Sequence, residues 1–215
     1  MKVCTDSCLF GAMLSTLYSN AVNALDIGSG TGLLSLMYAQ QNSNCKIDAI
    51  EIDEAAYQQS LQNISQSTCI NVVNKSIIDF VATEKYNFIF SNPPFFKNSL
   101  KSPNELRNLA MHNSVLSYEL LIKKATSLLA QNGLFAVLLP FEAQEEFIEI
   151  ALQQKIFVTT IINIQQTFSH SFFRTVLVFS FHKTEIAQQF IAIKNNENQY
   201  TEQFIDLLKD YYLNL

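Results

Sequence analysis

The sequence predicts an α/β fold in which a mainly parallel β-sheet carries helices on both faces. Short apolar runs alternate along the chain with stretches of helical periodicity, a pattern typical of repeated strand–helix units. A glycine-rich segment at residues 28–32 follows the first of these runs and opens a helical stretch. Near the C-terminus, two runs of β-branched and aromatic residues follow each other without a helical pattern between them, which indicates an antiparallel hairpin.

Each strand of the parallel part is predicted from an apolar run bounded by polar or glycine residues. The expected strands are residues 22–27, 46–51, 70–74, 86–91 and 133–139. The expected helices are residues 32–41, 53–64, 117–130 and 142–154. The hairpin is expected from residues 156–164 and 175–182 at the edge of the sheet, which makes a seven-stranded sheet. Residues 190–194 are a candidate for one more short strand, and residues 201–211 for a closing helix.

The composition predicts one soluble domain over residues 1–215. Of the 215 residues, 48% are hydrophobic, which is enough to bury a sizeable core. Asp6 and other polar residues interrupt the N-terminal segment, so it does not resemble a signal peptide, and no apolar stretch reaches the roughly 18 residues of a membrane span. The cysteines and histidines form no metal-binding pattern. We therefore expect a cytoplasmic monomer with free thiols, no metal and no membrane contact.

A carboxylate and three glycines occur where the first strand meets its helix. Asp26 is followed by Gly28, Gly30 and Gly32, and glycines in such a turn let the backbone approach a ligand closely. Dinucleotide-binding folds use the spacing G-x-G-x-x-G to bind a pyrophosphate, whereas the spacing here is G-x-G-x-G. The carboxylate would repel a pyrophosphate but suits a cation. S-Adenosylmethionine carries an ammonium and a sulfonium group and no phosphate, so the sequence predicts this cofactor.

Two further segments are predicted to hold the nucleoside part of this cofactor. Glu51 ends the second strand, where a carboxylate can accept hydrogen bonds from both ribose hydroxyls. Ser76, Ile77, Ile78 and Asp79 follow the third strand. There we expect Ile77 or Ile78 to supply an apolar face, and Ser76 or Asp79 a polar contact, for the adenine ring. Taken alone, Glu51 could equally be a solvated acid, and Ile77 could equally be a core residue.

The segment Asn92-Pro93-Pro94-Phe95 follows the fourth strand and faces the same edge of the sheet as the glycine loop. Two prolines fix the backbone and remove two N–H donors, which leaves carbonyl oxygens to point into a pocket. The exocyclic amine of a base is a poor nucleophile because its lone pair is delocalised. The Asn92 side-chain oxygen and the Pro93 carbonyl can accept both amino hydrogens and orient the nitrogen toward the methyl group. Phe95 is expected to stack on an extruded base, and these four residues are the predicted catalytic residues.

With these motifs in place, the chain resembles the bacterial tRNA1(Val) adenine-37 N6-methyltransferases. The matching segments are residues 1–7, 25–34, 47–51, 91–96, 107–112, 174–177 and 198–202. The resemblance implies a Rossmann-like class I methyltransferase fold, S-adenosylmethionine as cofactor and a tRNA as substrate. It also implies that Thr5 and Asp6 lie at the methionine end of the cofactor, and that Asn92 contacts the cofactor as well as the substrate. Cys4 and Ser7 depart from the family pattern M-K-V-G-T-D-G/A.

The RNA contacts are predicted from a few basic residues. The net charge of −5 argues against a broad basic surface, so a local patch would have to bind the RNA. Lys97, Lys101 and Arg107 flank the loop after the Asn-Pro-Pro turn and are predicted to contact phosphates. Arg174 begins a strand that is similar to the family's R-x-L-L segment and is the fourth predicted contact.

Three other functions remain open from the sequence. Guanine-N2 methyltransferases acting on ribosomal RNA also use Asn-Pro-Pro-Phe, but typically continue with histidine where this chain has Phe96. Protein glutamine methyltransferases hold an amide at a similar turn and prefer tyrosine at the position of Phe95. A partner subunit that binds the cofactor without catalysing a reaction is the third, and the intact Asn92-to-Phe95 segment argues against it.

Overall fold

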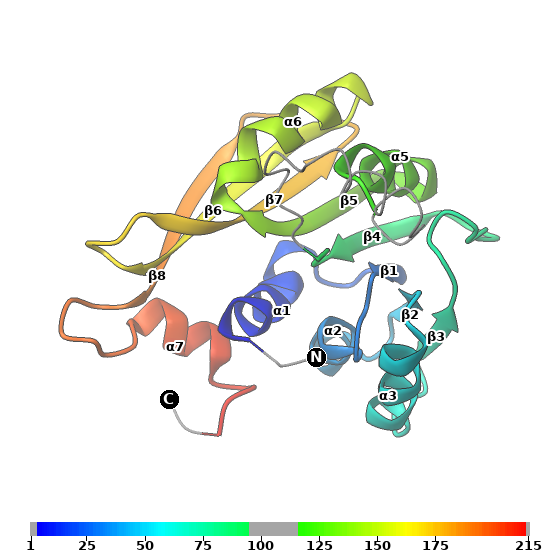
Figure 1. Ribbon diagram of the computed structural model, residues 1–215, viewed down its shortest axis with the longest axis horizontal. Helices are drawn as coiled ribbons and strands as arrows, with labels where there is room; N and C mark the ends of the chain where they lie inside the picture. Colours follow the sequence, from blue (N-terminus) through cyan, green and yellow to red (C-terminus); the bar gives the residue numbers. More distant parts are fainter. Residues whose placement is uncertain (1–3, 95–115, 214–215) are drawn as a thin grey trace, which may run out of the picture.

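The computed structural model describes residues 4–94 and 116–213, which form one mixed sheet with helices on both faces (Figure 1). The elements in chain order are α1 (Thr5–Leu17), β1 (Asn23–Ile27), α2 (Leu33–Gln41), β2 (Lys46–Glu51), α3 (Glu54–Ile64), β3 (Ile70–Asn74), β4 (Tyr86–Ser91), α5 (Tyr118–Leu128), β5 (Leu129–Pro140), the 3-10 turn η1 (Phe141–Ala143), α6 (Gln144–Gln153), β6 (Phe157–Thr167), β7 (Phe172–Ser180), β8 (Ala187–Lys194) and α7 (Glu202–Leu208). The predicted α/β fold is confirmed.

The parallel half of the sheet matches the expected strands closely. In the order β3-β2-β1-β4-β5, every pair of neighbours is parallel. The register places Ile27 at the end of β1 beside Ile50 of β2 and beside Ser91 of β4. The residues that follow these three strand ends therefore meet at one edge of the sheet, where ligands of such folds bind.

The C-terminal half differs from the expectation in two ways. The sheet has eight strands rather than seven, because β8 covers residues 187–194 and pairs parallel to β6. The antiparallel pair β6–β7 therefore lies inside the sheet, between β5 and β8, and not at its edge. Only the second half of β8 is buried (Ile191, Ala192 and Ile193). The exposed first half has no apolar pattern that would predict a strand, and backbone pairing with β6 supplies it instead.

Two apolar cores fill the layers on either side of the sheet. One cluster joins α1, α2 and α7 to the sheet around Tyr38, Phe88 and Phe90. The other joins α5 and α6 to the opposite face around Phe135 and Phe147. Figure 1 shows α5 and α6 above the sheet, with α1, α2 and α7 below it. Among the described residues, no helix is both long and apolar enough to cross a membrane.

Candidate active site

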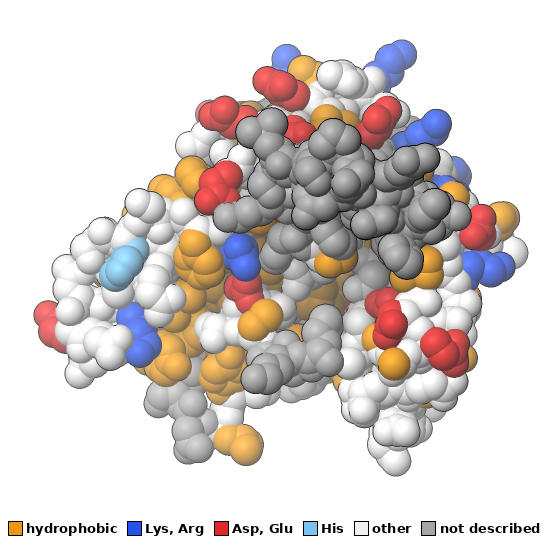
Figure 2. Space-filling view, in the orientation of Figure 1, with side chains coloured by type: hydrophobic (Ala, Val, Ile, Leu, Met, Phe, Trp, Pro, Cys, Tyr) orange, Lys and Arg blue, Asp and Glu red, His pale blue; other side chains and the backbone are white. Residues whose placement is uncertain are grey.

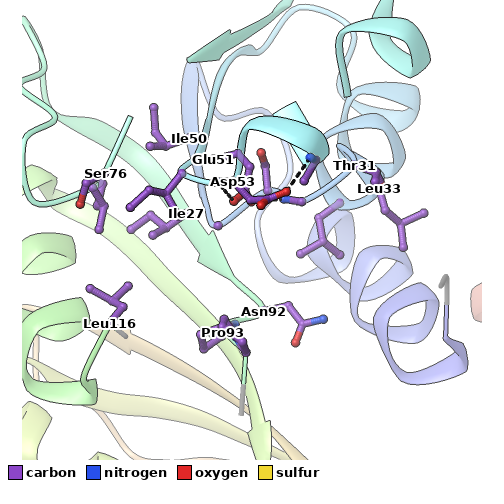
Figure 3. A pocket seen from close by; sticks show the side chains of 18 of the residues that line it. Ile27, Thr31, Leu33, Ile50, Glu51, Asp53, Ser76, Asn92, Pro93 and Leu116 are labelled. Carbon is purple, nitrogen blue, oxygen red and sulfur yellow. Dashed lines mark hydrogen bonds between the residues drawn. The ribbon is translucent and has the colours of Figure 1, made fainter. Parts of the chain in front are cut away.

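A cavity of about 670 Å³ opens where β1, β2 and β4 end. This volume lies within the roughly 300–1,000 Å³ of sites that bind small molecules. Figure 3 shows Ile27 and Ser76 on one side, Glu51 and Asp53 on another, and Asn92 and Pro93 facing them. The predicted cofactor residues that line the cavity are Gly28, Gly30, Glu51, Ser76, Ile77 and Asn92. The sheet register thus brings together three motifs that are far apart in the sequence.

The glycine loop turns sharply between β1 and α2. Gly28, Gly30 and Gly32 have φ angles of 73°, 57° and 85°, a left-handed conformation that glycine adopts without strain. The N–H groups of Gly28 and Ser29 both donate to the carbonyl of Ile50, which ties the loop to β2. Gly32 does not line the cavity, and a Cβ there would lie 2.6 Å from Ile64 Cδ1. Gly32 therefore allows the loop to pack against α3.

Glu51 is held in place by backbone donors from two loops. Its Oε2 accepts from the Gly30 N–H at 2.7 Å, and its Oε1 accepts from the Asp53 N–H at 2.8 Å (Figure 3). The residue is 8% exposed and lines the cavity. Each carboxylate oxygen has two lone pairs, so both oxygens can still accept a hydrogen bond from a ligand hydroxyl.

Asp26 lies beneath the glycine loop and not in the cavity wall. The residue is fully buried, and Ser35 Oγ donates to its Oδ2 at 2.7 Å. The pKa of Asp26 is raised to about 7, because burial and, to a smaller extent, the charge of Glu51 outweigh the Ser35 hydrogen bonds that lower it. Asp26 Oδ1 and Ser29 Oγ are buried polar atoms without a hydrogen-bond partner among the described residues. Ser29 lines the cavity and is not among the residues predicted from the sequence.

The region predicted for adenine has the expected apolar character and one apolar residue more, Ile52. Ser76 and Ile77 line the cavity together with Ile52 and Ile78. Ile52 is 51% exposed and Ile78 is 45% exposed, although both are large apolar side chains. In the sequence, the signal that could have identified Ile52 is its place directly after Glu51, the end of the second strand. Two apolar side chains left open to a cavity suit the faces of an aromatic ring.

The Asn-Pro-Pro turn begins where β4 ends. Ser91 Oγ donates to the Ile27 carbonyl at 2.7 Å, which joins the ends of β4 and β1. Asn92 Nδ2 donates to Ser7 Oγ at 2.8 Å. Pro93 is buried and Pro94 exposed, and both line the cavity beside Asn92. Phe95, Lys97, Lys101 and Arg107, which were predicted to contact the base or the RNA, lie outside the described residues.

The start of α1 reaches the cavity through residues that were not predicted. Cys4 and Ser7 line it, whereas the predicted cofactor residues Thr5 and Asp6 do not. Asp6 Oδ2 instead accepts from Arg174 Nε at 2.7 Å. Burial raises the pKa of Asp6, but hydrogen bonds from Cys4 and Arg174, the Arg174 charge and the Ser7 N–H outweigh burial and lower it. Arg174, predicted to contact RNA, is thus held in an ion pair within the protein.

Several of the residues predicted to contact a ligand have structural partners within the protein. Asp26 and Gly32 support the glycine loop, and Asp6 anchors the first turn of α1. These residues shape the site from behind its wall. Within residues 4–94 and 116–213, no group of His, Cys, Asp and Glu side chains could hold a metal ion.

The chain is similar in sequence to known methyltransferases. Residues 10–168 match the model of the methyltransferase small domain. The chain is 39% identical over its whole length to a tRNA1(Val) (adenine(37)-N6)-methyltransferase of Pseudoalteromonas translucida, of which it covers 93%. It is 35% identical over its whole length to a protein of the same name from Flavobacterium psychrophilum, of which it covers 94%.

Solved structures share the fold. A predicted O-methyltransferase of Agrobacterium tumefaciens superposes with a TM-score of 0.75 at 14% identity, over 98% of this chain and all of that one. A methyltransferase of Pyrococcus furiosus superposes with a TM-score of 0.63 at 24% identity, over 85% of each chain.

Proposed function

The chain belongs to the tRNA1(Val) (adenine(37)-N6)-methyltransferase family, and we propose that it methylates the N6 amine of adenine 37 in a valine tRNA with S-adenosylmethionine as methyl donor. The observation that carries this proposal is the Asn92-Pro93-Pro94 turn at the wall of a cavity built by a glycine loop and Glu51. The acceptor groups of the turn thus lie in the same cavity as the residues predicted to hold the cofactor.

Three structural features of the cavity fit this cofactor. Glu51 presents a fixed carboxylate to it, as a ribose diol requires. Ile52 and Ile78 offer apolar surface for an adenine ring. Ser29 Oγ is a buried polar atom in the cavity wall without a partner among the described residues, as expected of a group that bonds a ligand. When bound, S-adenosylmethionine supplies an electrophilic methyl group on its sulfonium.

The protein contributes orientation and acceptors rather than a strong base. An exocyclic amine has two hydrogens, and the Asn92 Oδ1 and the Pro93 carbonyl can accept one each. Both acceptors are preorganised, because the Ser91–Ile27 hydrogen bond and the two prolines fix the turn. They stabilise the positive charge that develops on the amine nitrogen as the new bond forms, which lowers the energy of the transition state. The N6 nitrogen is positively charged once it has taken the methyl group, and in that state it is acidic enough to release a proton to water.

The test is methyl transfer from labelled cofactor to RNA of a strain that lacks the gene, followed by nucleoside analysis. We expect label in N6-methyladenosine at position 37 of a valine tRNA. Label in N2-methylguanosine of ribosomal RNA, or in protein glutamine, would replace this proposal with one of the alternative activities. No transfer by the purified chain, together with binding of the cofactor, would indicate a partner subunit without activity.

We also propose that residues 1–215 act as one methyltransferase domain, as a monomer in the cytoplasm where tRNA is modified. The continuous sheet supports the single domain, because β5 pairs with both β4 and β7. Sedimentation of the purified protein with and without tRNA tests the monomer, and a mass of twice 24.4 kDa for the free protein would contradict it.

A further inference from the structure

We propose that Ser7 is a positioning residue that sets the orientation of the Asn92 amide. Ser7 Oγ accepts a hydrogen bond from Asn92 Nδ2 at 2.8 Å, across 85 residues of sequence. An asparagine amide has a donor end and an acceptor end of nearly equal shape, so its orientation depends on its partners. A contact that uses the donor end leaves Oδ1 for the substrate. The inference rests on the proposed function and adds to it a residue of α1.

The direction of this contact matters for the choice of substrate. Figure 3 shows the Asn92 amide nitrogen on the side of α1 and the oxygen turned away from it. In this orientation the free end of Asn92 is an acceptor, which pairs with an N–H group. The reversed amide would present two N–H donors, which repel an amine and favour a ring nitrogen or a carbonyl. Ser7 therefore favours a substrate with an exocyclic amine.

Ser7 is itself fixed by neighbours that hold it from the other side. The residue is 8% exposed, and its N–H donates to Asp6 Oδ1 at 3.0 Å. Asp6 Oδ2 accepts from Arg174 of β7 at 2.7 Å. Cys4 Sγ lies 3.0 Å from Ser7 Oγ, close enough to accept the hydroxyl hydrogen. When the Ser7 hydroxyl donates its hydrogen to Cys4 Sγ, a lone pair of Ser7 Oγ remains to accept from Asn92 Nδ2.

Glycine or alanine at position 7 would carry no hydroxyl group and could not make the contact with Asn92. Without Ser7, the Asn92 amide would still adopt the productive orientation for part of the time. Loss of the hydroxyl should therefore slow turnover moderately and not abolish it. A single intramolecular hydrogen bond corresponds to roughly a three- to tenfold change.

The chain offers a matched control for the key variant. Ser15, also on α1, accepts from Asn42 Nδ2 at 3.0 Å, and neither residue lines the cavity. Ser7→Ala and Ser15→Ala thus each remove one serine–asparagine hydrogen bond from the same helix. We expect Ser7→Ala to lower kcat by roughly three- to tenfold, with unchanged KM for RNA and unchanged affinity for S-adenosylhomocysteine. Ser15→Ala should leave kcat unchanged.

Two further measurements separate positioning from a general structural effect. In an Asn92→Ala background, Ser7→Ala should cause no additional loss of kcat, because no amide remains to be oriented. Ser7→Thr keeps the hydroxyl group and should restore most of the turnover lost in Ser7→Ala. An equal loss from Ser7→Ala in both backgrounds, or wild-type kcat in Ser7→Ala, would overturn the proposal.

A readout without RNA distinguishes this inference from the proposed function. The side-chain amide signals of Asn92 in an NMR spectrum can be assigned as the pair missing from Asn92→Asp. We expect this pair to shift in Ser7→Ala and to stay unchanged in Ser15→Ala. If the pair does not shift in Ser7→Ala, the inference fails even where RNA is methylated. If it shifts but the wild-type protein methylates no RNA, the proposed function fails and the orientation by Ser7 stands.

Discussion

Asp26 shows how one buried carboxyl group couples proton binding to the site. It has no exposed surface, Ser35 is its hydrogen-bond donor, and one of its oxygens has no partner among the described residues. Burial penalises the charged form and raises the pKa to about 7, which places the titration in the range where the protein would work. A cationic ligand above the glycine loop would favour the charged form again.

The first prediction is that Asp26 makes stability depend on pH between about 4 and 7. In this window the unfolded chain has released the Asp26 proton while the folded protein retains it, so the free energy of unfolding falls as pH rises. A difference of three pKa units corresponds to about 4 kcal/mol at most. Asp26→Asn removes this contribution. In urea unfolding, the free energy of unfolding of the variant minus that of the wild type should therefore be larger at pH 8 than at pH 4.5. Parallel stability curves would contradict the prediction.

Cofactor binding gives an independent check on Asp26. Since a cationic ligand favours the carboxylate, binding to the wild type near pH 6.5 should release protons. Calorimetry in two buffers with different ionisation enthalpies measures this release directly. Asp26→Asn should bind without it, and equal proton release from both proteins would assign the titration to another group.

The second prediction concerns Asn92 and the reaction. Asn92→Ala removes a preorganised acceptor and should lower kcat by ~10²–10³. Affinity for S-adenosylhomocysteine should fall far less than kcat, because Glu51 and the glycine loop remain intact even though one predicted cofactor contact of Asn92 is lost. Asn92→Asp still offers acceptor oxygens and should be impaired less than Asn92→Ala. Single-turnover methyl transfer measures the rates, and full activity of Asn92→Ala would exclude the mechanism for every candidate substrate.

Among the elements, α1 is joined to β7 by an ion pair at its first turn. Asp6 and Arg174 are 11% and 24% exposed at their side chains and lie 168 residues apart in sequence. Asp6 also accepts from the Ser7 N–H, so the ion pair and the first turn of α1 are joined. A partly buried carboxylate that loses its cation keeps its desolvation cost.

The third prediction is that Arg174→Ala destabilises the protein by about 1–3 kcal/mol at neutral pH. Because the pKa of Asp6 is lowered in the folded state, the pair stabilises above the unfolded pKa of about 4 and loses its effect as pH falls through the lower folded value. The difference between variant and wild type should therefore shrink in acid. Lys209→Ala, which breaks the exposed Lys209–Asp206 pair, is the control and should cost less than about 1 kcal/mol. Equal losses in urea unfolding would contradict the prediction.

The elements that the sequence predicted well are those with a pattern of their own. The bounds of β2, β3 and β4 match the expected residues, because each is an apolar run between polar segments. β8 was expected only as residues 190–194, because its first residues are exposed and take their conformation from pairing with β6. Likewise, β5 begins at Leu129 and not at the expected residue 133, because Leu129 pairs with Tyr86 of β4. Pairing between distant strands leaves no local pattern.

Across the whole molecule, the sequence predicted where the site lies better than which side chains line it. Motifs at strand ends meet at one edge in a parallel sheet, so Gly28, Glu51 and Asn92 could be brought together from the sequence. Ser7 could not, since its contact with Asn92 depends on how α1 packs across the sheet. Direct ligand roles for Asp6 and Asp26 stay predictions; both residues are buried, and neither lines the cavity.

The overall charge restricts how such a chain could bind RNA. The net charge is −5. On the face of the molecule that Figure 2 shows, Lys and Arg side chains are scattered among Asp and Glu. Arg174 is ion-paired with Asp6. Lys97, Lys101 and Arg107, which lie outside the described residues, follow the Asn-Pro-Pro turn in sequence. Phosphate contacts concentrated next to the site would allow an acidic protein to bind RNA locally.

The last prediction follows from this arrangement. Each phosphate contact releases about 0.7–0.9 counterions, so the combined change of Lys97, Lys101 and Arg107 to alanine should reduce the slope of log affinity against log salt by about 2–3. RNA affinity should fall most at low salt, and affinity for S-adenosylhomocysteine should stay unchanged. Fluorescence anisotropy with labelled tRNA between 50 and 200 mM salt measures the slope. Lys123→Ala with Lys124→Ala, on α5, is the control and should change it less. If the triple variant keeps the wild-type slope, the RNA must dock on another surface or with another chain.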